Sequence, residues 1–312
     1  MRRYERLTAG TILAGFGLIV FGGVVRVSGS GMGCGPNWPV CNGQVVPVFS
    51  LATAIEYTHR LLAALVTLLT VGLVLLDWHR RREVRSLLQL PILALALVLA
   101  QAGLGAVAVL QDLSPWVVAA HLGMAEAYLG CVVVLGVALV AQRRTSTPAG
   151  RELGALAPVA AAAVYLVTLT GAYTAASGAS LACGWPLCGD RVVPTGWTPV
   201  DVQLTHRWAA LAAIVAVVAL ALRARRVRPD RPRLAQATTV AAVTIAVQAL
   251  IGAANVWLGL APWVRELHLA VAVVIWAMLV GVAAADRLLG APAHGQSTAP
   301  RPSTLAGVTS RR

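Results

Sequence analysis

Long runs of hydrophobic residues, separated by short polar segments, dominate the chain. A transmembrane helix needs about 20 mostly apolar residues. Eight stretches reach that length, at residues 7–28, 52–77, 88–110, 116–141, 156–177, 201–222, 234–258 and 263–286. Pro, Gly, Arg and Asp occupy the connections between them, where a helix can end and meet water. The pattern predicts an all-α, polytopic membrane protein.

The composition supports this interpretation. Hydrophobic residues make up 58% of the 312 residues, charged residues only 12%, and the mean hydropathy is +0.76. Soluble domains carry about 25% charged residues, so a soluble enzyme is excluded. The net charge is +13, and all 25 basic residues are arginines. Such an excess suggests nucleic acid or a membrane as partner, depending on where the arginines lie.

Most of the arginines lie in alternate connections and near the two ends of the chain. These 20 arginines are Arg2, Arg3, Arg6, Arg80, Arg81, Arg82, Arg85, Arg143, Arg144, Arg151, Arg223, Arg225, Arg226, Arg228, Arg231, Arg233, Arg287, Arg301, Arg311 and Arg312. The positive-inside rule places these segments, and both termini, in the cytoplasm, with the helices in the cell membrane. The charge therefore indicates topology; we expect contact with membrane lipid and no nucleic-acid partner.

The sequence also repeats itself with an offset of 147 residues. The matching segments are Glu56–Arg60 and Gln203–Arg207, Gln101–Gly105 and Gln248–Gly252, and His121 and His268. Such a repeat predicts two tandem units, each with an even number of spans and therefore in parallel orientation. We expect the units at residues 1–148 and 149–287, followed by a disordered, Pro-, Ala-, Ser- and Thr-rich cytoplasmic tail at 288–312.

Each unit carries one histidine in its second span and one in its fourth: His59 and His121, then His206 and His268. At 1.5 Å per residue, all four lie roughly 10 Å inside the outer boundary, so the members of each pair can face each other. A single histidine could be only a hydrogen-bonded structural residue, but two matched pairs favour a functional role. Two imidazoles in an apolar four-helix core suit the axial positions of a haem iron. Zinc would need further ligands that each unit lacks.

The two long outer connections, residues 29–51 and 178–200, each hold a pair of cysteines. These pairs are Cys34 with Cys41 and Cys183 with Cys188. Thiols outside the cytoplasm can oxidise, so we expect one disulfide in each loop. The disulfides are either structural staples that shape a lid over the bundle or redox-active pairs.

Residues present in only one unit are candidates for chemistry. Glu56 aligns with Gln203, so the carboxylate is specific to the first unit, where it shares a helix face with His59. A desolvated carboxyl there can exchange protons; alternatively, it makes a structural contact near the helix start. Glu126 is a second carboxylate of the first unit, suited to a proton relay or to pairing with a polar neighbour.

Four arginines near the outer face are candidates for neutralising haem carboxylates, because a guanidinium binds a carboxylate in bidentate fashion. They are Arg26, Arg60, Arg207 and Arg265. Snorkelling of the side chains to the interface explains them equally well. Arg265 could also form an ion pair with Glu266.

Taken together, these features resemble the haem A synthase family. The resemblance rests on eight spans in two repeats, the Glu-x-x-His-Arg segment, the three further histidines and the Cys-containing outer loop, and it covers about residues 7–286. It implies oxidation of the C8 methyl group of haem O to the formyl group of haem A, with water as the oxygen source. It also implies a role in cytochrome c oxidase assembly, haem O synthase as a partner and an electron acceptor of unknown identity.

The resemblance further implies a division of labour. His59 and His121 would bind the substrate haem O in a catalytic first half, with Glu56 as the essential carboxylate. His206 and His268 would hold a permanent haem b. The alternative is a plain di-haem electron-transfer cytochrome, which explains the four histidines but not why only the first half has Glu56 and Glu126.

Overall fold

The computed structural model describes residues 2–36, 38–80, 87–143, 152–227 and 231–289, which contain eight helices long and apolar enough to cross a membrane. Their bounds are α1 Arg2–Val27, α2 Leu51–Arg80, α3 Gln89–Leu110, α4 Pro115–Gln142, α5 Leu156–Ala176, α6 Pro199–Arg226, α7 Pro232–Trp257 and α8 Pro262–Leu288. The described residues contain no β-strand, so the predicted all-α, polytopic fold is confirmed. Residues 290–312 of the expected disordered tail lie outside the described residues.

Several helices extend past the apolar runs that predict them. α1 begins at Arg2 and α2 continues to Arg80, so each adds about a turn of charged or polar residues. An ion pair supports one such extension, because Arg143 Nη2 lies 2.5 Å from Glu5 Oε2. Charged residues at a helix end can keep the helical backbone while their side chains reach water.

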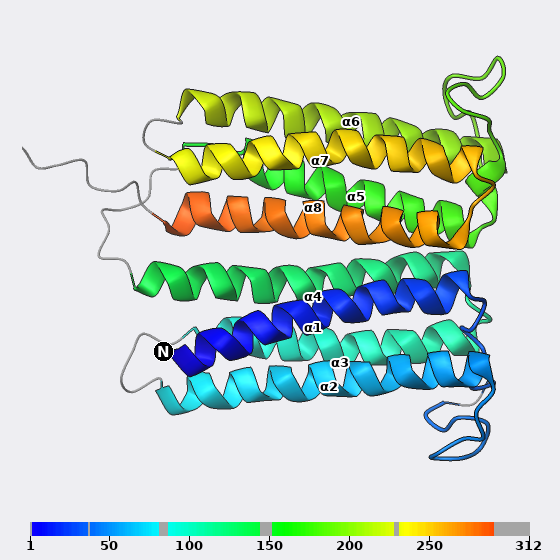
Figure 1. Ribbon diagram of the computed structural model, residues 1–312, viewed down its shortest axis with the longest axis horizontal. Helices are drawn as coiled ribbons and strands as arrows, with labels where there is room; N and C mark the ends of the chain where they lie inside the picture. The colour runs from blue at the N-terminus through cyan, green and yellow to red at the C-terminus, as the bar shows by residue number, and fades with distance from the viewer. Residues whose placement is uncertain (1, 37, 81–86, 144–151, 228–230, 290–312) are drawn as a thin grey trace, which may run out of the picture.

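The helices run side by side, with α1–α4 packed as one four-helix bundle and α5–α8 as a second (Figure 1). The two long loops that carry the cysteine pairs, 28–50 and 177–198, lie at the same end; we call it the cysteine-loop end (Figure 1). The start of α1 and the last turns of α2, α4, α6 and α8 lie at the opposite end. This arrangement agrees with the alternation of arginine-rich segments along the sequence.

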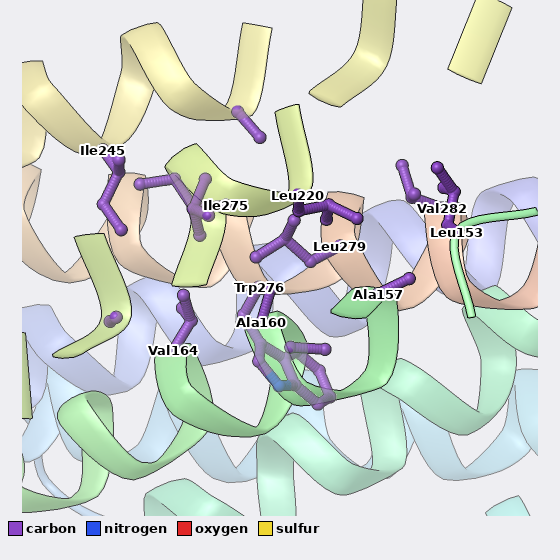
Figure 2. Packing of buried hydrophobic residues seen from close by; sticks show 14 of the residues in the cluster. Leu153, Ala157, Ala160, Val164, Leu220, Ile245, Ile275, Trp276, Leu279 and Val282 are labelled. Carbon is purple, nitrogen blue, oxygen red and sulfur yellow. The ribbon is translucent and has the colours of Figure 1, made fainter. Parts of the chain in front are cut away.

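The two parts join where α4 and α1 pack against α8, and where α4 packs against α5. Trp276 of α8, which is 6% exposed, inserts its indole against the backbone of Gly130 on α4. Figure 2 shows Trp276 among apolar side chains of α5 and α8, including Val164 and Leu279. The division at residue 148 stays a prediction, since that residue lies outside the described part of the chain.

Candidate functional site

The four histidines stand at corresponding places in four parallel helices. His59 lies on α2, His121 on α4, His206 on α6 and His268 on α8, each about two turns from the cysteine-loop end. Within each half the two imidazoles interact electrostatically, His59 with His121 and His206 with His268. The structure thus brings together the members of each pair that the repeat predicts.

Each imidazole lies against a glycine of the preceding helix. The four pairs are Gly22 with His59, Gly105 with His121, Gly171 with His206 and Gly252 with His268. A β-carbon built on these glycines would lie 3.2, 3.1, 2.8 and 3.1 Å, respectively, from the Cε1 atom of the imidazole. A side chain at any of them would therefore displace the ring, and the repeated contact makes a cradle that sets the position of each histidine.

The donor set fits a haem iron better than a protein-ligated zinc ion. The described residues contain no group of three or more His, Cys, Asp or Glu side chains that could hold a metal ion. Each half instead offers two imidazoles, the number of axial positions on a haem iron. Three of the four imidazoles also keep a buried Nδ1 atom without a hydrogen-bond partner in the described chain: His59, His121 and His268.

Glu56 links the first cysteine loop to α2. Its side chain is 5% exposed, and its Oε2 atom accepts a hydrogen bond of 2.7 Å from the backbone N–H of Cys34. Its Oε1 atom lies 2.6 Å from Arg60 Nη2, in an ion pair across one helical turn. Arg60 also donates to the carbonyl oxygens of Pro39 and Val40. The carboxylate therefore lies between the loop and the turn of α2 that carries the histidine, and it makes structural contacts near the helix start.

The second loop is fastened by different residues. Gln203, the counterpart of Glu56, keeps a buried Oε1 atom without a hydrogen-bond partner in the described structure. Asp201 instead anchors the second loop to α6. It forms an ion pair with Arg191 and accepts hydrogen bonds from the backbone N–H groups of Thr195 and Thr198. Among the described residues, the carboxylate one helical turn from the histidine is therefore specific to the first half: Glu56 precedes His59 on α2, whereas Gln203 precedes His206 on α6.

Arg207 also serves the second loop. It donates to the carbonyl oxygens of Gly184, at 2.6 Å, and Pro186, at 3.2 Å. Its guanidinium carbon lies 5.4 Å from the centre of the Trp185 ring, within cation–π range. Like Arg60, it is engaged with loop backbone rather than left free for a ligand.

Disulfides close both loops. Cys34 bonds to Cys41 and Cys183 to Cys188, with Cα–Cα distances of 4.3 and 4.7 Å. The remaining cysteine, Cys131, is a buried free thiol on α4. The bridges are present, and whether they act as staples or as redox pairs stays open.

The remaining candidates lie at the junction between the halves. Glu126 is fully buried, and neither carboxylate oxygen has a hydrogen-bond partner in the described residues. It interacts with Tyr165 of α5, and thus faces the second half rather than the histidine pair of its own half. Arg26 and Arg265 approach each other across α1 and α8, close enough to interact electrostatically.

One sequence expectation at this junction is wrong. Arg265 and Glu266 interact only at longer range and form no ion pair within the described chain. Neighbouring residues on a helix point in directions about 100° apart, so adjacency does not bring two side chains together. The carboxylate of Glu266 instead lies against α1, where a β-carbon at Gly23 would overlap it.

Comparison with known proteins places the chain in a family. Residues 5–53 and 48–280 match the profile of a family described as cytochrome oxidase assembly protein, COX15-CtaA. A protein of Alkalihalophilus pseudofirmus named "Heme A synthase" is 32% identical over 212 residues, which cover 65% of this chain and 71% of the relative. The chain belongs to the haem A synthase family. A second member, from Bacillus pumilus, is 30% identical over 253 residues, covering 78% of this chain and 82% of the relative.

Membership of the haem A synthase family extends over the whole candidate site. The matched residues include the four histidines, Glu56 and both cysteine loops, and they end before the last helical turns of α8. The glycine cradles were missed by sequence reasoning, although Gly105 and Gly252 stand inside a repeated segment. The signal was there in the repeat, but only the packing shows which glycine meets a histidine.

Proposed function

We propose that this protein is a haem A synthase, an oxidoreductase acting on a CH group. It would oxidise the C8 methyl group of haem O to the formyl group of haem A, with water supplying the oxygen. The observation that carries the proposal is the pair of imidazole sites, each cradled by glycines, of which only one has a buried carboxylate one helical turn away.

The halves would divide the work. His59 and His121 would hold the substrate haem O in residues 1–148, and His206 and His268 would hold a resident haem b in residues 149–287. A haem b iron supplies one-electron chemistry when it is bound. The protein would supply the imidazole ligands, the glycine surfaces that orient them and the apolar helices that keep water away.

Glu56 would act as the proton-handling group of the first half. Its carboxylate shares a helix face with His59 and is held in place by Arg60 and by the Cys34 N–H. Oxidation of a methyl group with water releases protons as well as electrons, so a carboxylate near the outer loop can accept and pass on protons. The electrons would go to a separate acceptor.

Arginines that are not bound to a loop would neutralise the carboxylates of the haem. Arg60 and Arg207 are committed to the loops. Arg26 and Arg265 form no ion pair within the described residues and lie together at the junction of α1 and α8. They are therefore the better candidates for binding haem carboxylates, while Glu126, facing α5, would serve a relay between the halves.

Topology and partners follow from the same proposal. The described residues contain eight helices long and apolar enough to cross a membrane, which makes this a multi-pass membrane protein. The arginine distribution supports insertion in the cell membrane with both termini in the cytoplasm. Haem O synthase would supply the substrate, and assembly of cytochrome c oxidase would consume the product.

Expression in a host that makes haem O but no haem A tests the function directly. We expect extracted pigment to contain haem A and the purified protein to carry haem B alongside haem O or haem A. Pyridine haemochrome spectra distinguish the three haems. A protein that carries only haem B and leaves haem O unchanged would instead be a di-haem electron-transfer cytochrome.

The glycine cradle gives a matched pair of variants. Gly105→Leu would place a side chain against the imidazole of His121, where even a β-carbon lies 3.1 Å from Cε1. We expect this variant to lose most haem O binding, measured as haem O per protein after purification. Gly103→Leu is the control, because a β-carbon at Gly103 on the same helix meets nothing within 4 Å. Equal haem O contents in the two variants would contradict the cradle.

A further inference from the structure

The two halves differ in the hydrogen bonding of one imidazole. In the second half, Nδ1 of His206 lies 3.2 Å from the hydroxyl oxygen of Thr170 on α5. The same hydroxyl donates to the carbonyl oxygen of Val167 at 3.0 Å. A hydroxyl has a single proton. When Thr170 gives that proton to Val167, its oxygen accepts a hydrogen bond from Nδ1–H of His206, and the Val167 backbone also interacts with this imidazole. The arrangement therefore favours the tautomer in which Nδ1 carries the hydrogen and Nε2 keeps its lone pair.

Thr170 directly precedes Gly171, the cradle glycine of His206. One short segment of α5 therefore provides both the flat surface against which the imidazole lies and a hydroxyl oxygen that can accept a hydrogen bond from Nδ1–H. A ring held in this way presents Nε2 in a fixed direction. A partner on the far nitrogen of a ligating histidine also raises the basicity of the ligand.

The first half has no such acceptor. Aligning its cradle glycine, Gly22, with Gly171 places Phe21 opposite Thr170. The Phe21 ring lies nearly parallel to the imidazole of His59, with ring centroids 6.4 Å apart and an interplanar angle of 15°. Phenylalanine has no polar atom, and Nδ1 of His59 is buried without a hydrogen-bond partner among the described residues.

The other two histidines do not share this difference. His121 and His268 occupy equivalent places, and Nδ1 of each is buried without a partner in the described chain. The asymmetry between the halves is thus confined to the α2- and α6-type histidines, through the exchange of Phe21 for Thr170.

We infer that Thr170 is a positioning residue that makes the haem of the second half resident, while Phe21 leaves the haem of the first half exchangeable. The inference rests on the proposed function. A substrate haem must enter and leave, so it is better served by a histidine that binds the iron more weakly and has no hydrogen-bond partner on Nδ1. A permanent haem is retained better by a histidine whose hydrogen bond to Thr170 holds the ring in one direction and favours a free lone pair on Nε2.

The test replaces Thr170 with Val, which keeps the shape and removes the hydroxyl. Haem b loss is followed by transfer to excess apomyoglobin, using the Soret absorbance of purified, haem-loaded protein. We expect loss to be about tenfold faster or more, the range seen when such outer partners are removed from ligating histidines. Thr170→Ser, which retains a hydroxyl, is expected to restore slow loss.

The control is Thr174→Val, one turn further along α5. Its hydroxyl donates only to its own helix, to the carbonyl oxygen of Thr170 at 2.7 Å. We expect wild-type haem retention there and, for Thr170→Val, a shifted midpoint potential of the haem that remains. Haem loss from Thr170→Val at the wild-type rate would overturn this inference but would leave the proposed function unaffected. A wild-type protein that binds no haem would overturn the proposed function.

Discussion

Replacing Glu56 with Gln is expected to stop the conversion of haem O to haem A while haem b stays bound. The amide cannot take up a proton, and removal of a general base costs about 10²–10⁴-fold in rate. The Gln side chain still offers an oxygen to the Cys34 N–H, which Glu56 binds at 2.7 Å, so the loop keeps that anchor. Pigment extraction from membranes of a haem O-producing host would measure the loss of haem A.

The contact with Arg60 calls for a matched variant. Arg60→Gln removes the same 2.6 Å ion pair but leaves the carboxylate and its bond to Cys34 in place. If Glu56 handles protons, Arg60→Gln should keep far more activity than Glu56→Gln. Equal losses would mean that the carboxylate only fastens the loop. Normal haem A production by Glu56→Gln would remove Glu56 from the mechanism.

The fold could be predicted because its main signal is local. Each of the eight helices has an apolar run long enough to span a membrane, and no long-range information is needed to find such a run. Helix ends were less predictable. α1 begins at Arg2 rather than at residue 7, because the ion pair between Glu5 and Arg143 joins residues that the sequence does not show to be neighbours.

The candidate site also has features that the sequence predicts and features that only the packing of the helices reveals. The histidine pairs could be predicted because the repeat places them at matching depths in parallel helices. The glycine cradles and Thr170 could not, because each depends on which faces of two helices meet. His206 and Thr170 are 36 residues apart, and only the packing of α5 on α6 brings them within 3.2 Å.

Helix geometry also explains why one carboxylate forms an ion pair and another does not. Glu56 and Arg60 are four residues apart, lie on one face and form an ion pair. Arg265 and Glu266 are adjacent, diverge around the helix and form none in the described chain. Spacing, rather than nearness in sequence, was the reliable guide.

Replacing His268 with Ala is expected to remove haem b from the purified protein, whereas His121→Ala should leave haem b in place and abolish haem A formation. The two histidines are equivalent in the repeat. A β-carbon built on the glycine beside each of them would lie 3.1 Å from the Cε1 atom of the imidazole. They nevertheless belong to different pairs, one with His206 and one with His59. Loss of one of these histidines should therefore remove haem only from its own half.

Haem b retention is measured as the ratio of haem B to protein, by pyridine haemochrome, in a host that makes neither haem O nor haem A. Haem A formation is measured separately, by pigment extraction from a host that makes haem O. His79→Ala is the control, because His79 lies in the last turn of α2, at the end opposite the histidine pairs, and should keep a full complement of haem b. Loss of haem b from His121→Ala but not from His268→Ala would reverse the roles of the halves. Loss from both would mean that a single haem depends on the two halves together, in which case the Phe21 and Thr170 difference could not separate a resident haem from an exchangeable one.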